Sequence, residues 1–400
     1  MDISAPRIAW SFIGFSLSLF VPGMDQIQKY LGTTSVLPYI FIAFSTLVVL
    51  YRYFLPRFLS KVTEKEAVWL AALTFVVLVG VFAVVYPIAD SGIVGGGSDR
   101  DDNIDVATKA LIRGRYPYYY LGYLGQPTDS LPGALFLALP FVLLGKSAYQ
   151  NLLWLAVFFI VARSYLRDER LALLLLWAVL LLSPGVLREV VTGGDLISNT
   201  IYVLVFMLFM VNSIPDPNRS SWMKWLSAIL LGVGLSSRGN FILLLPVVFS
   251  TLVQRAGWKP AIKYTATTCV ILGGVTVPFF LYDPPSFHPL TTLDRIGQFE
   301  SIVPLARLII PLLAGIIAVA LSFQRMDHDD IILLRNSAIV QAFLVLSMVG
   351  LSTSQARALN LRFTEYGLFF LFFGGLAFWA DLVTKATGVV SANAAEMAPG

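Results

Sequence analysis

Apolar runs near the length of a membrane-spanning helix recur from one end of this 400-residue chain to the other. About 20 apolar residues are needed to cross the hydrocarbon core of a bilayer as an α-helix. Hydrophobic residues make up 57% of the chain and charged residues 13%, whereas about a quarter of the residues in a soluble domain are charged. We therefore expect an all-α fold, a polytopic transmembrane helical bundle.

Hydropathy and turn residues predict about twelve spans. They are residues 8–22, 35–55, 67–88, 148–165, 171–185, 197–213, 222–237, 239–254, 262–282, 302–323, 331–353 and 361–380. A further apolar run, residues 131–145, is short and contains Pro132 and Pro140, which is more typical of an interfacial or re-entrant segment. We expect residues 1–390 to form one transmembrane domain and residues 391–400 a disordered tail.

The distribution of lysine and arginine predicts which ends of the spans face the cytoplasm. With residues 131–145 at the membrane surface and the N-terminus in the cytoplasm, the compact basic loops fall on the cytoplasmic side. Four other segments then lie on the outer face: residues 89–147, 188–195, 282–301 and 354–362. The sequence therefore predicts a multi-pass protein of the cell (inner) membrane with cytoplasmic termini and an extracytoplasmic active site. Residues 89–147 would be its first large outer loop, with juxtamembrane helices.

Charge and residue counts exclude two classes of function. A formal net charge of +4, spread along the chain, does not indicate a nucleic-acid partner. With one cysteine, Cys269, and two histidines, a metal site built from histidine and cysteine is excluded. We expect membrane lipids, rather than nucleic acid, among the partners of the chain.

Carboxylates gather in the segment from Gly95 to Gly133, although the chain around it is mostly apolar. They are Asp99, Asp101, Asp102, Asp105 and Asp129. A helix is predicted from Ser98, capped by the S-x-x-D pair that Ser98 forms with Asp101. Its apolar face would carry Ile104, Ala107 and Leu111, and its polar face Asp102, Asp105, Lys109 and Arg113. The pattern predicts an amphipathic helix lying against the outer membrane surface.

Three carboxylates over four positions repel one another more than helix capping requires. A carboxylate here could act as a general base on a hydroxyl that attacks a substrate, and crowding by like charges raises its pKa towards a useful range. Alternatively, two of the three could hold a divalent cation, Mg or Mn, in an oxygen-ligand site. Helix capping or a solvated acidic loop also accounts for Asp105 and Asp129.

Several motifs occur in order on the predicted outer side. Asp99 follows a span, and ALIRGRYPYY (110–119), a P-x-x-x-L-P-G element (127–133) and FVLLG (141–145) follow it. SPGVLREVVTGGD (183–195), LLGVGLSSRGNFILLLPVV (230–248) and PFFLYDPPSFHP (278–289) come later. Over roughly residues 67–290 this order resembles the GT-C superfamily, the integral-membrane glycosyltransferases that use polyprenyl-phosphate sugars.

The resemblance implies transfer of a sugar from a polyprenyl-phosphate-linked donor to a hydroxyl acceptor on the outer face, which is a glycolipid, a polysaccharide or a protein. In that superfamily an aspartate of the first outer loop is the catalytic base. Asp99 fits this role best by position, with Asp101 and Asp102 as close rivals. The mechanism expected is a single displacement that inverts the anomeric carbon.

A lipid-phosphate donor needs cations for its leaving group. The arginines on or near the predicted outer side are Arg188, Arg238, Arg295, Arg357 and Arg362. Of these, Arg238 is the main candidate, with help from Arg357 or Arg362. Arg238 lies in SSRGN between two apolar runs, where a charged group is costly and usually functional. A guanidinium matches the geometry of phosphate oxygens. The remaining candidates for substrate binding are Asp105, Tyr118, Glu189, Asp195 and His288.

Two other functions remain open. A secondary transporter would carry ionisable residues in the middle of its spans and broken helices in matching halves. A glycan polymerase or ligase acting on undecaprenyl-diphosphate-linked chains would depend mainly on arginine and histidine in a large outer loop. Here the charged residues cluster near span ends, and the richest cluster is led by aspartate.

Overall fold

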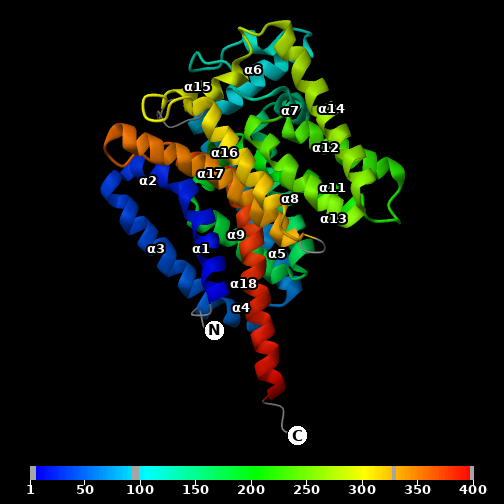
Figure 1. Ribbon diagram of the computed structural model, residues 1–400. Helices are drawn as coiled ribbons and strands as arrows, with labels where there is room; N and C mark the ends of the chain where they lie inside the picture. The colour runs from blue at the N-terminus through cyan, green and yellow to red at the C-terminus, as the bar shows by residue number, and fades with distance from the viewer. Residues whose placement is uncertain (1–5, 92–98, 327–329, 397–400) are drawn as a thin grey trace.

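The computed structural model describes residues 6–91, 99–326 and 330–396, and the fold is all-α, as predicted (Figure 1). The helices before the candidate site are α1 Pro6–Phe20, α2 Met24–Leu31, α3 Val36–Val49, α4 Leu55–Lys61 and α5 Glu64–Asp90. The middle of the chain forms α6 Arg100–Ile112, α7 Pro132–Leu143, α8 Gln150–Leu166, α9 Glu169–Leu182, α10 Pro184–Thr192, α11 Leu196–Ser213 and α12 Ser221–Leu235. The remaining helices are α13 Leu245–Ala256, α14 Trp258–Tyr282, α15 Thr291–Gly297, α16 Ala306–Ser322, α17 Asp330–Ala356 and α18 Leu368–Glu396.

The prediction of about twelve spans is wrong. Within the described residues, seven helices are long and apolar enough to cross a bilayer, or up to nine if each of two bent helix pairs is one span. The predicted spans 8–22, 222–237 and 302–323 correspond to α1, α12 and α16, which have only 15, 15 and 17 residues. At 1.5 Å per residue these helices are about 23–26 Å long, shorter than the ~30 Å hydrocarbon core.

Residues at the helix ends explain why these three helices are shorter than the predicted spans. A 3-10 turn that contains Pro22 follows α1, and α12 stops before Ser236. Leu305, which precedes α16, has a left-handed backbone with φ of 56°. Apolar residues beyond these points are in turns, so an apolar run overstates the length of the helix. At the C-terminus, residues 391–396 of the predicted disordered tail continue α18, and residues 397–400 lie outside the described residues.

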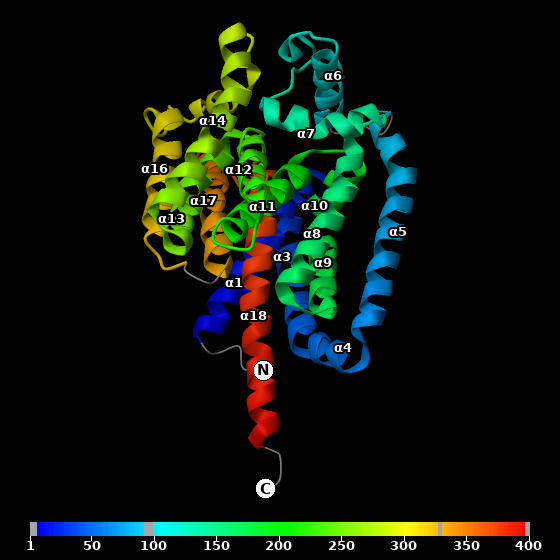
Figure 2. The same cartoon turned by 90° about the vertical axis from the view of Figure 1, so that its right-hand side faces the viewer.

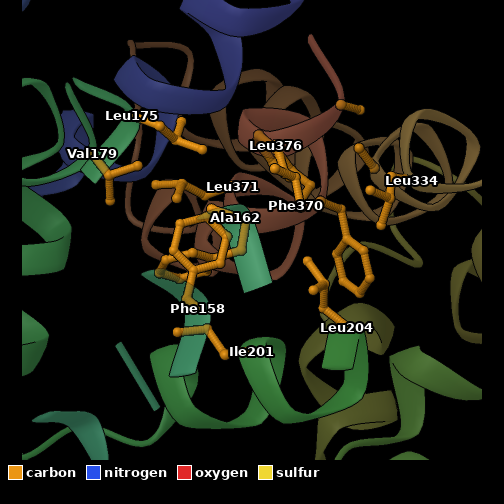
Figure 3. Close-up of a cluster of buried hydrophobic side chains, with 14 of the residues drawn as sticks. Phe158, Ala162, Leu175, Val179, Ile201, Leu204, Leu334, Phe370, Leu371 and Leu376 are labelled. Carbon is orange, nitrogen blue, oxygen red and sulfur yellow. The ribbon is translucent and has the colours of Figure 1, made fainter. Parts of the chain in front are cut away.

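The core lies among α8, α9, α11, α17 and α18. Figure 3 shows its side chains meeting: Phe158, Ala162, Leu175, Val179, Ile201, Leu204, Leu334, Phe370, Leu371 and Leu376. In α11, 83% of the 18-residue apolar stretch that could cross a membrane is buried inside the protein. The apolar stretch within residues 364–384, mostly in α18, is buried to the same extent. The corresponding shares are 17% for α5 and 11% for α14. Helices α11 and α18 are therefore central, and α5 and α14 present apolar faces that lipid would cover.

Helices α6, α7 and α15 lie at one end of the bundle, and α4, the start of α1 and the end of α18 lie at the other (Figures 1 and 2). Helix α7 runs across the bundle because the chain bends by 98° between it and the helix that continues as α8. Residues 131–145 therefore do not extend α8 as a straight span, in keeping with the surface segment predicted for them. A second bend, of 82°, separates α9 from α10.

The apolar stripe predicted for the first outer loop packs on protein. Ile104 and Ala107 of α6 are buried against Leu135, Ala138 and Val142 of α7. Full burial of a leucine or isoleucine side chain stabilises a fold by about 1.5–3 kcal/mol, so this contact fixes α6 on α7. The predicted helix exists, but α7 covers its apolar face where the membrane surface was expected.

Candidate functional site

A cavity of about 790 Å³ opens at the end of the bundle that carries α6 and α15. Segments far apart in the sequence form its walls: the start of α6, residues 126–129, residues 288–298 and residues 362–366. The lining residues are Asp99, Arg100, Asn103, Gln126, Pro127, Asp129, His288, Thr291, Asp294, Arg295, Gln298, Arg362, Phe363, Glu365 and Tyr366. Three of the segments that the sequence assigned to one face therefore meet around one space.

Asp99 stands in the wall of this cavity as the residue that immediately precedes α6. Its side chain makes no capping hydrogen bond to the helix, and within the described part of the chain its carboxylate has no polar partner. Ser98 and Gly95–Gly97 lie outside the described residues, so the predicted capping pair of Ser98 with Asp101 cannot be located.

Asp101 and Asp102 point away from the cavity, to other partners. Asp101 is 1% exposed and accepts a hydrogen bond of 2.6 Å from the Tyr86 hydroxyl. Burial raises the pKa of Asp101 from 3.8 to about 7, against the effect of the Tyr86 hydrogen bond, and Asp102 and Asp90 raise it further. Asp102 Oδ1 lies 3.3 Å from Lys146 Nζ. The tertiary structure thus separates three carboxylates that are neighbours in sequence.

This divergence does not fit the alternative in which two of the three hold Mg or Mn. Asp101 and Asp102 face a tyrosine hydroxyl and a lysine, and only Asp99 faces the cavity. Residues 6–91, 99–326 and 330–396 contain no group of three or more histidine, cysteine, aspartate or glutamate side chains placed to hold a metal ion. We therefore derive no step through a metal.

Asp105 is buried, although the sequence placed it on a solvated helix face. It is 2% exposed, and its Oδ1 accepts a hydrogen bond of 2.8 Å from the Ser147 backbone N–H. Its Oδ2 lies 4.0 Å from both Lys109 and Lys146. Burial raises the pKa of Asp105, and the bonds from Ser147 oppose this. Asp105 therefore ties α6 to Ser147, in the short segment that precedes α8, and it does not line the cavity.

Arg238 lies behind the cavity wall, with its charge already balanced. Its Nη2 donates to both oxygens of Asp195 at 2.7 and 2.5 Å, and its Nη1 donates to Asp129 Oδ1 at 2.7 Å. Asp195 is fully buried and also accepts hydrogen bonds from Ser130 and Asn199. A guanidinium held between two carboxylates is a poor ligand for a donor phosphate, so the structure favours a positioning role for Arg238.

Backbone contacts bring these groups together. The N–H groups of Leu131 and Gly133, at the start of α7, donate to the carbonyl oxygens of Ser237 and Ser236 at 3.0 and 2.9 Å. The start of α7 is thereby attached to the turn after α12, and Asp129 is brought beside Arg238. Short-range sequence patterns give no indication of this pairing, because the partners are about a hundred residues apart.

Asp129 connects the buried ion pair of Arg238 and Asp195 to the cavity. Its Oδ2 lies 3.2 Å from Arg295 Nη1, and Arg295 also donates to the Tyr366 hydroxyl at 2.6 Å. Burial alone would raise the pKa of Asp129, but Arg238 and Arg295 outweigh it and lower the pKa from 3.8 to about 2. Arg295 is 45% exposed, so part of its guanidinium remains open to the cavity.

A second set of ion pairs ties α6 to α10 and to the segment before α18. Arg100 donates to Glu189 Oε1 and to Glu365 Oε1, both at 2.8 Å, and Arg188 lies 3.4 Å from Glu365. Glu189 is 1% exposed and also accepts from the Leu196 N–H. Residues 188–195 were expected to form an outer turn, but residues 188–192 belong to helix α10, Pro184–Thr192. Glu189 therefore secures the frame of the cavity and does not line it.

The other predicted residues divide between the cavity and its surroundings. Arg362 lines the cavity, donates to Gln298 at 2.5 Å and is exposed. Arg357 is exposed outside the lining. His288 lines the cavity. Tyr118 is buried, packs against Tyr116 and Phe287, and donates to the Ser130 carbonyl, so its contacts are structural.

Sequence reasoning did not select several residues of the cavity: Arg100, Asn103, Arg295, Glu365 and Tyr366. Arg100 stands inside the aspartate cluster, and its charge opposite to its neighbours was an available signal. Glu365 and Tyr366 lie just after the last predicted outer turn. Comparison with known proteins adds no further residue, because no family model, curated protein or solved structure matches this chain.

Proposed function

We propose that this protein is a membrane glycosyltransferase that moves a sugar from a polyprenyl-phosphate donor to an acceptor hydroxyl, with the cavity on the extracytoplasmic side. One observation carries the proposal: Asp99 and the two exposed arginines Arg295 and Arg362 line the same cavity at one end of an apolar helical bundle. A carboxylate without a polar partner in the described chain can accept a proton, and guanidinium groups can receive a departing phosphate.

Asp99 is the proposed general base. The rival carboxylates Asp101 and Asp102 are turned towards Tyr86 and Lys146, and Asp129 is held ionised by two arginines. A base must come within hydrogen-bond reach of the proton that it removes. Of the three aspartates of the DRDD cluster, only Asp99 is among the lining residues.

Arg295 and Arg362 are the proposed ligands of the leaving phosphate. Within the described residues, Arg295 has a single carboxylate partner, Asp129, at 3.2 Å. Arg362 donates to the neutral amide of Gln298. Both can turn part of their charge towards a ligand. Two guanidinium groups match the two ionised oxygens of a phosphate monoester dianion. This proposal transfers the donor-phosphate role from Arg238 and Arg357 to Arg295 while keeping Arg362.

Side chains suited to a sugar line the rest of the cavity. Asn103, Gln126 and Gln298 can donate to and accept from hydroxyl groups, and Phe363 and Tyr366 offer aromatic rings. A volume of about 790 Å³ is within the range of ligand sites, about 300–1,000 Å³. It would hold a hexose or pentose with its phosphate, while the polyprenyl chain lies in the membrane.

The reaction balances without a cofactor. The acceptor O–H gives its proton to Asp99, and the oxygen forms a bond to the anomeric carbon. The bond between that carbon and the phosphate oxygen breaks, and its electron pair leaves with the polyprenyl phosphate. Arg295 and Arg362 meet the charge that develops on the departing phosphate. One displacement inverts the anomeric configuration.

The alternatives lack comparable support. The charged groups of the cavity come from the start of α6, the loop before α7, helix α15 and the segment before α18. None of them lies at the middle of a broken span, where a transporter site is expected. A polymerase or ligase that acts on diphosphate-linked chains would depend on arginine and histidine. His288 lines the cavity, but a carboxylate is available as the base.

The test is transfer by the purified protein in nanodiscs, with a panel of synthetic polyprenyl-phosphate sugars and chromatography of the products. Asp99→Asn is expected to lower the turnover number by about 10²–10⁴-fold while donor binding is retained. Asp283→Asn is the matched control, because Asp283 lies at the same end of the molecule but outside the cavity. Full activity of Asp99→Asn would contradict the role of Asp99 as base, and failure of every polyprenyl-phosphate sugar would contradict the proposed reaction.

A further inference from the structure

A smaller pocket of about 170 Å³ lies at the far end of α6 from Asp99. We call it the α6 basic pocket, and its residues are Val106, Lys109, Ala110, Arg113, Arg115 and Tyr120. Three of these six residues are cationic and none is a carboxylate. At 1.5 Å per residue, the pocket is roughly 15 Å along the helix from the start of α6, so it is separate from the larger cavity.

The end of α6 places the cations around this pocket. Residues 106, 109, 110 and 113 share one helix face by their spacing. Gly114 then takes a left-handed conformation, with φ of 66°, which a residue without Cβ adopts easily. The Arg115 N–H donates back to the Ala110 carbonyl at 2.9 Å, so the chain folds over the helix end. Arg115 Nη1 donates to the Tyr120 hydroxyl at 3.2 Å.

The positive charge of the pocket is only weakly compensated. Lys109 is 47% exposed, and its Nζ lies 4.0 Å from Asp105. In the described part of the chain neither Arg113 nor Arg115 has a carboxylate partner, and both are exposed. A helix C-terminus favours cations in its last turn, which accounts for Lys109 and Arg113. It does not account for Arg115, which lies beyond the helix and is held in place by Tyr120.

We propose that the α6 basic pocket binds a phosphate-bearing anionic group. Guanidinium groups form paired hydrogen bonds with phosphate oxygens, and the Tyr120 hydroxyl adds a neutral donor. Val106 and Ala110 are the apolar residues that line the pocket, and they can contact the carbon atoms next to a phosphate ester. The source is either the headgroup of an anionic phospholipid or a soluble phosphate. This site does not depend on the proposed glycosyl transfer.

The topology proposed above gives a second reason for a ligand. If the end that carries α6 is extracytoplasmic, its cations are on the side where lysine and arginine are usually depleted. A cluster of three on that side needs a counter-charge. An anionic headgroup at the membrane surface would supply this counter-charge. It would also hold α6, and therefore Asp99, at a fixed distance from the membrane surface.

The experiment measures ligand-dependent unfolding temperatures of the full chain, purified in a neutral detergent. The probes are dioctanoyl phosphatidylglycerol, dioctanoyl phosphatidylcholine and inorganic phosphate. A ligand that binds only the native state raises the unfolding temperature in proportion to its affinity. The test variant is Arg113→Gln with Arg115→Gln, and the control is Arg357→Gln, an exposed arginine of the predicted outer face that lines neither cavity.

We expect the phosphatidylglycerol affinity to exceed that of phosphatidylcholine by at least about tenfold, and the double variant to lose this difference while the control keeps it. That result supports a lipid source. Stabilisation by inorganic phosphate that competes with phosphatidylglycerol and disappears in the double variant supports a soluble source. Equal affinities for the two lipids together with no stabilisation by inorganic phosphate, or a double variant that binds like the native chain, would overturn the proposal. If the double variant unfolds early, Lys109→Gln replaces it and is expected to show a smaller loss.

Discussion

Replacing Asp101 by asparagine tests the electrostatics of the aspartate cluster. Asp101 is 1% exposed and accepts a hydrogen bond from the Tyr86 hydroxyl at 2.6 Å. Burial raises its pKa from 3.8 to about 7, with further contributions from Asp102 and Asp90. Asparagine has nearly the same shape and keeps an oxygen for Tyr86, but it carries no charge at any pH. The substitution therefore isolates the cost of ionising this buried group.

The sign and size of the effect follow from the pKa. Because the folded-state pKa lies above the unfolded value of 3.8, the protonated carboxyl favours the fold. This stabilisation is complete below pH 3.8 and is lost as pH rises through about 7. At 1.36 kcal/mol per unit, the full shift corresponds to about 4 kcal/mol, and the part lost between pH 5 and pH 8 is about 3 kcal/mol. For 400 residues, that loss lowers the unfolding temperature by about 3–4 °C.

The assay is thermal unfolding in nanodiscs from pH 5 to pH 8, followed by tryptophan fluorescence. Native protein should lose more stability than Asp101→Asn as pH rises, and at pH 8 the variant should be the more stable of the two. Asp283→Asn, a change in a half-buried carboxylate that accepts a hydrogen bond from Tyr119, should show the same pH dependence as the native protein. Parallel pH profiles for the native chain and Asp101→Asn would refute the reasoning, since other titrating groups contribute equally to both.

Three further predictions concern the frame of the cavity. Arg238→Gln leaves Asp195 buried without its cation, and we expect a loss of about 3–5 kcal/mol in unfolding measurements, whereas a loss under 1 kcal/mol would contradict the pairing. Gly133→Ala would place a Cβ 2.3 Å from a backbone carbonyl oxygen of α12, so it should lower the unfolding temperature and the yield of folded protein; native-like stability would exclude this close approach. Arg295→Gln should lower the turnover number by about 10²-fold or more, and Arg357→Gln should not; equal effects of the two would argue against the phosphate ligands proposed for the cavity.

The position of a residue in the candidate site could be predicted where its neighbours in the sequence determine it. Asp99 follows a long apolar helix and precedes a helix with a clear apolar stripe, so its position at a helix end could be recognised from local spacing. Asp101 and Asp102 have similar local surroundings, yet one faces Tyr86 and the other Lys146. Helix rotation separates adjacent side chains by about 100°, and only the packing partners determine which of them faces the cavity.

The ion-pair partners of Arg238 could not be predicted from the sequence. Its place between two apolar runs indicated a costly and functional charge, which we assigned to a donor phosphate, and the structure shows it 7% exposed and paired with carboxylates. The partner could not be deduced, because Asp129 and Asp195 come from segments 109 and 43 residues away. Arg238, which was predicted to bind phosphate, therefore lies between two carboxylates in a buried ion network. Arg295 was not selected from the outer arginines for the opposite reason: it is an exposed residue of the short helix α15, and nothing in its local sequence distinguishes it.

The apolar composition and the period of the apolar runs determined by themselves that the chain is an all-α protein suited to a membrane, because a backbone in hydrocarbon must satisfy its own hydrogen bonds. The lengths of the helices, their bends and the convergence of residues 99–129, 288–298 and 362–366 were decided only by the tertiary structure. Turns end helices within apolar runs, and long-range packing and ion pairs select which charged side chains share a cavity. Those interactions join residues that have no fixed separation in the chain.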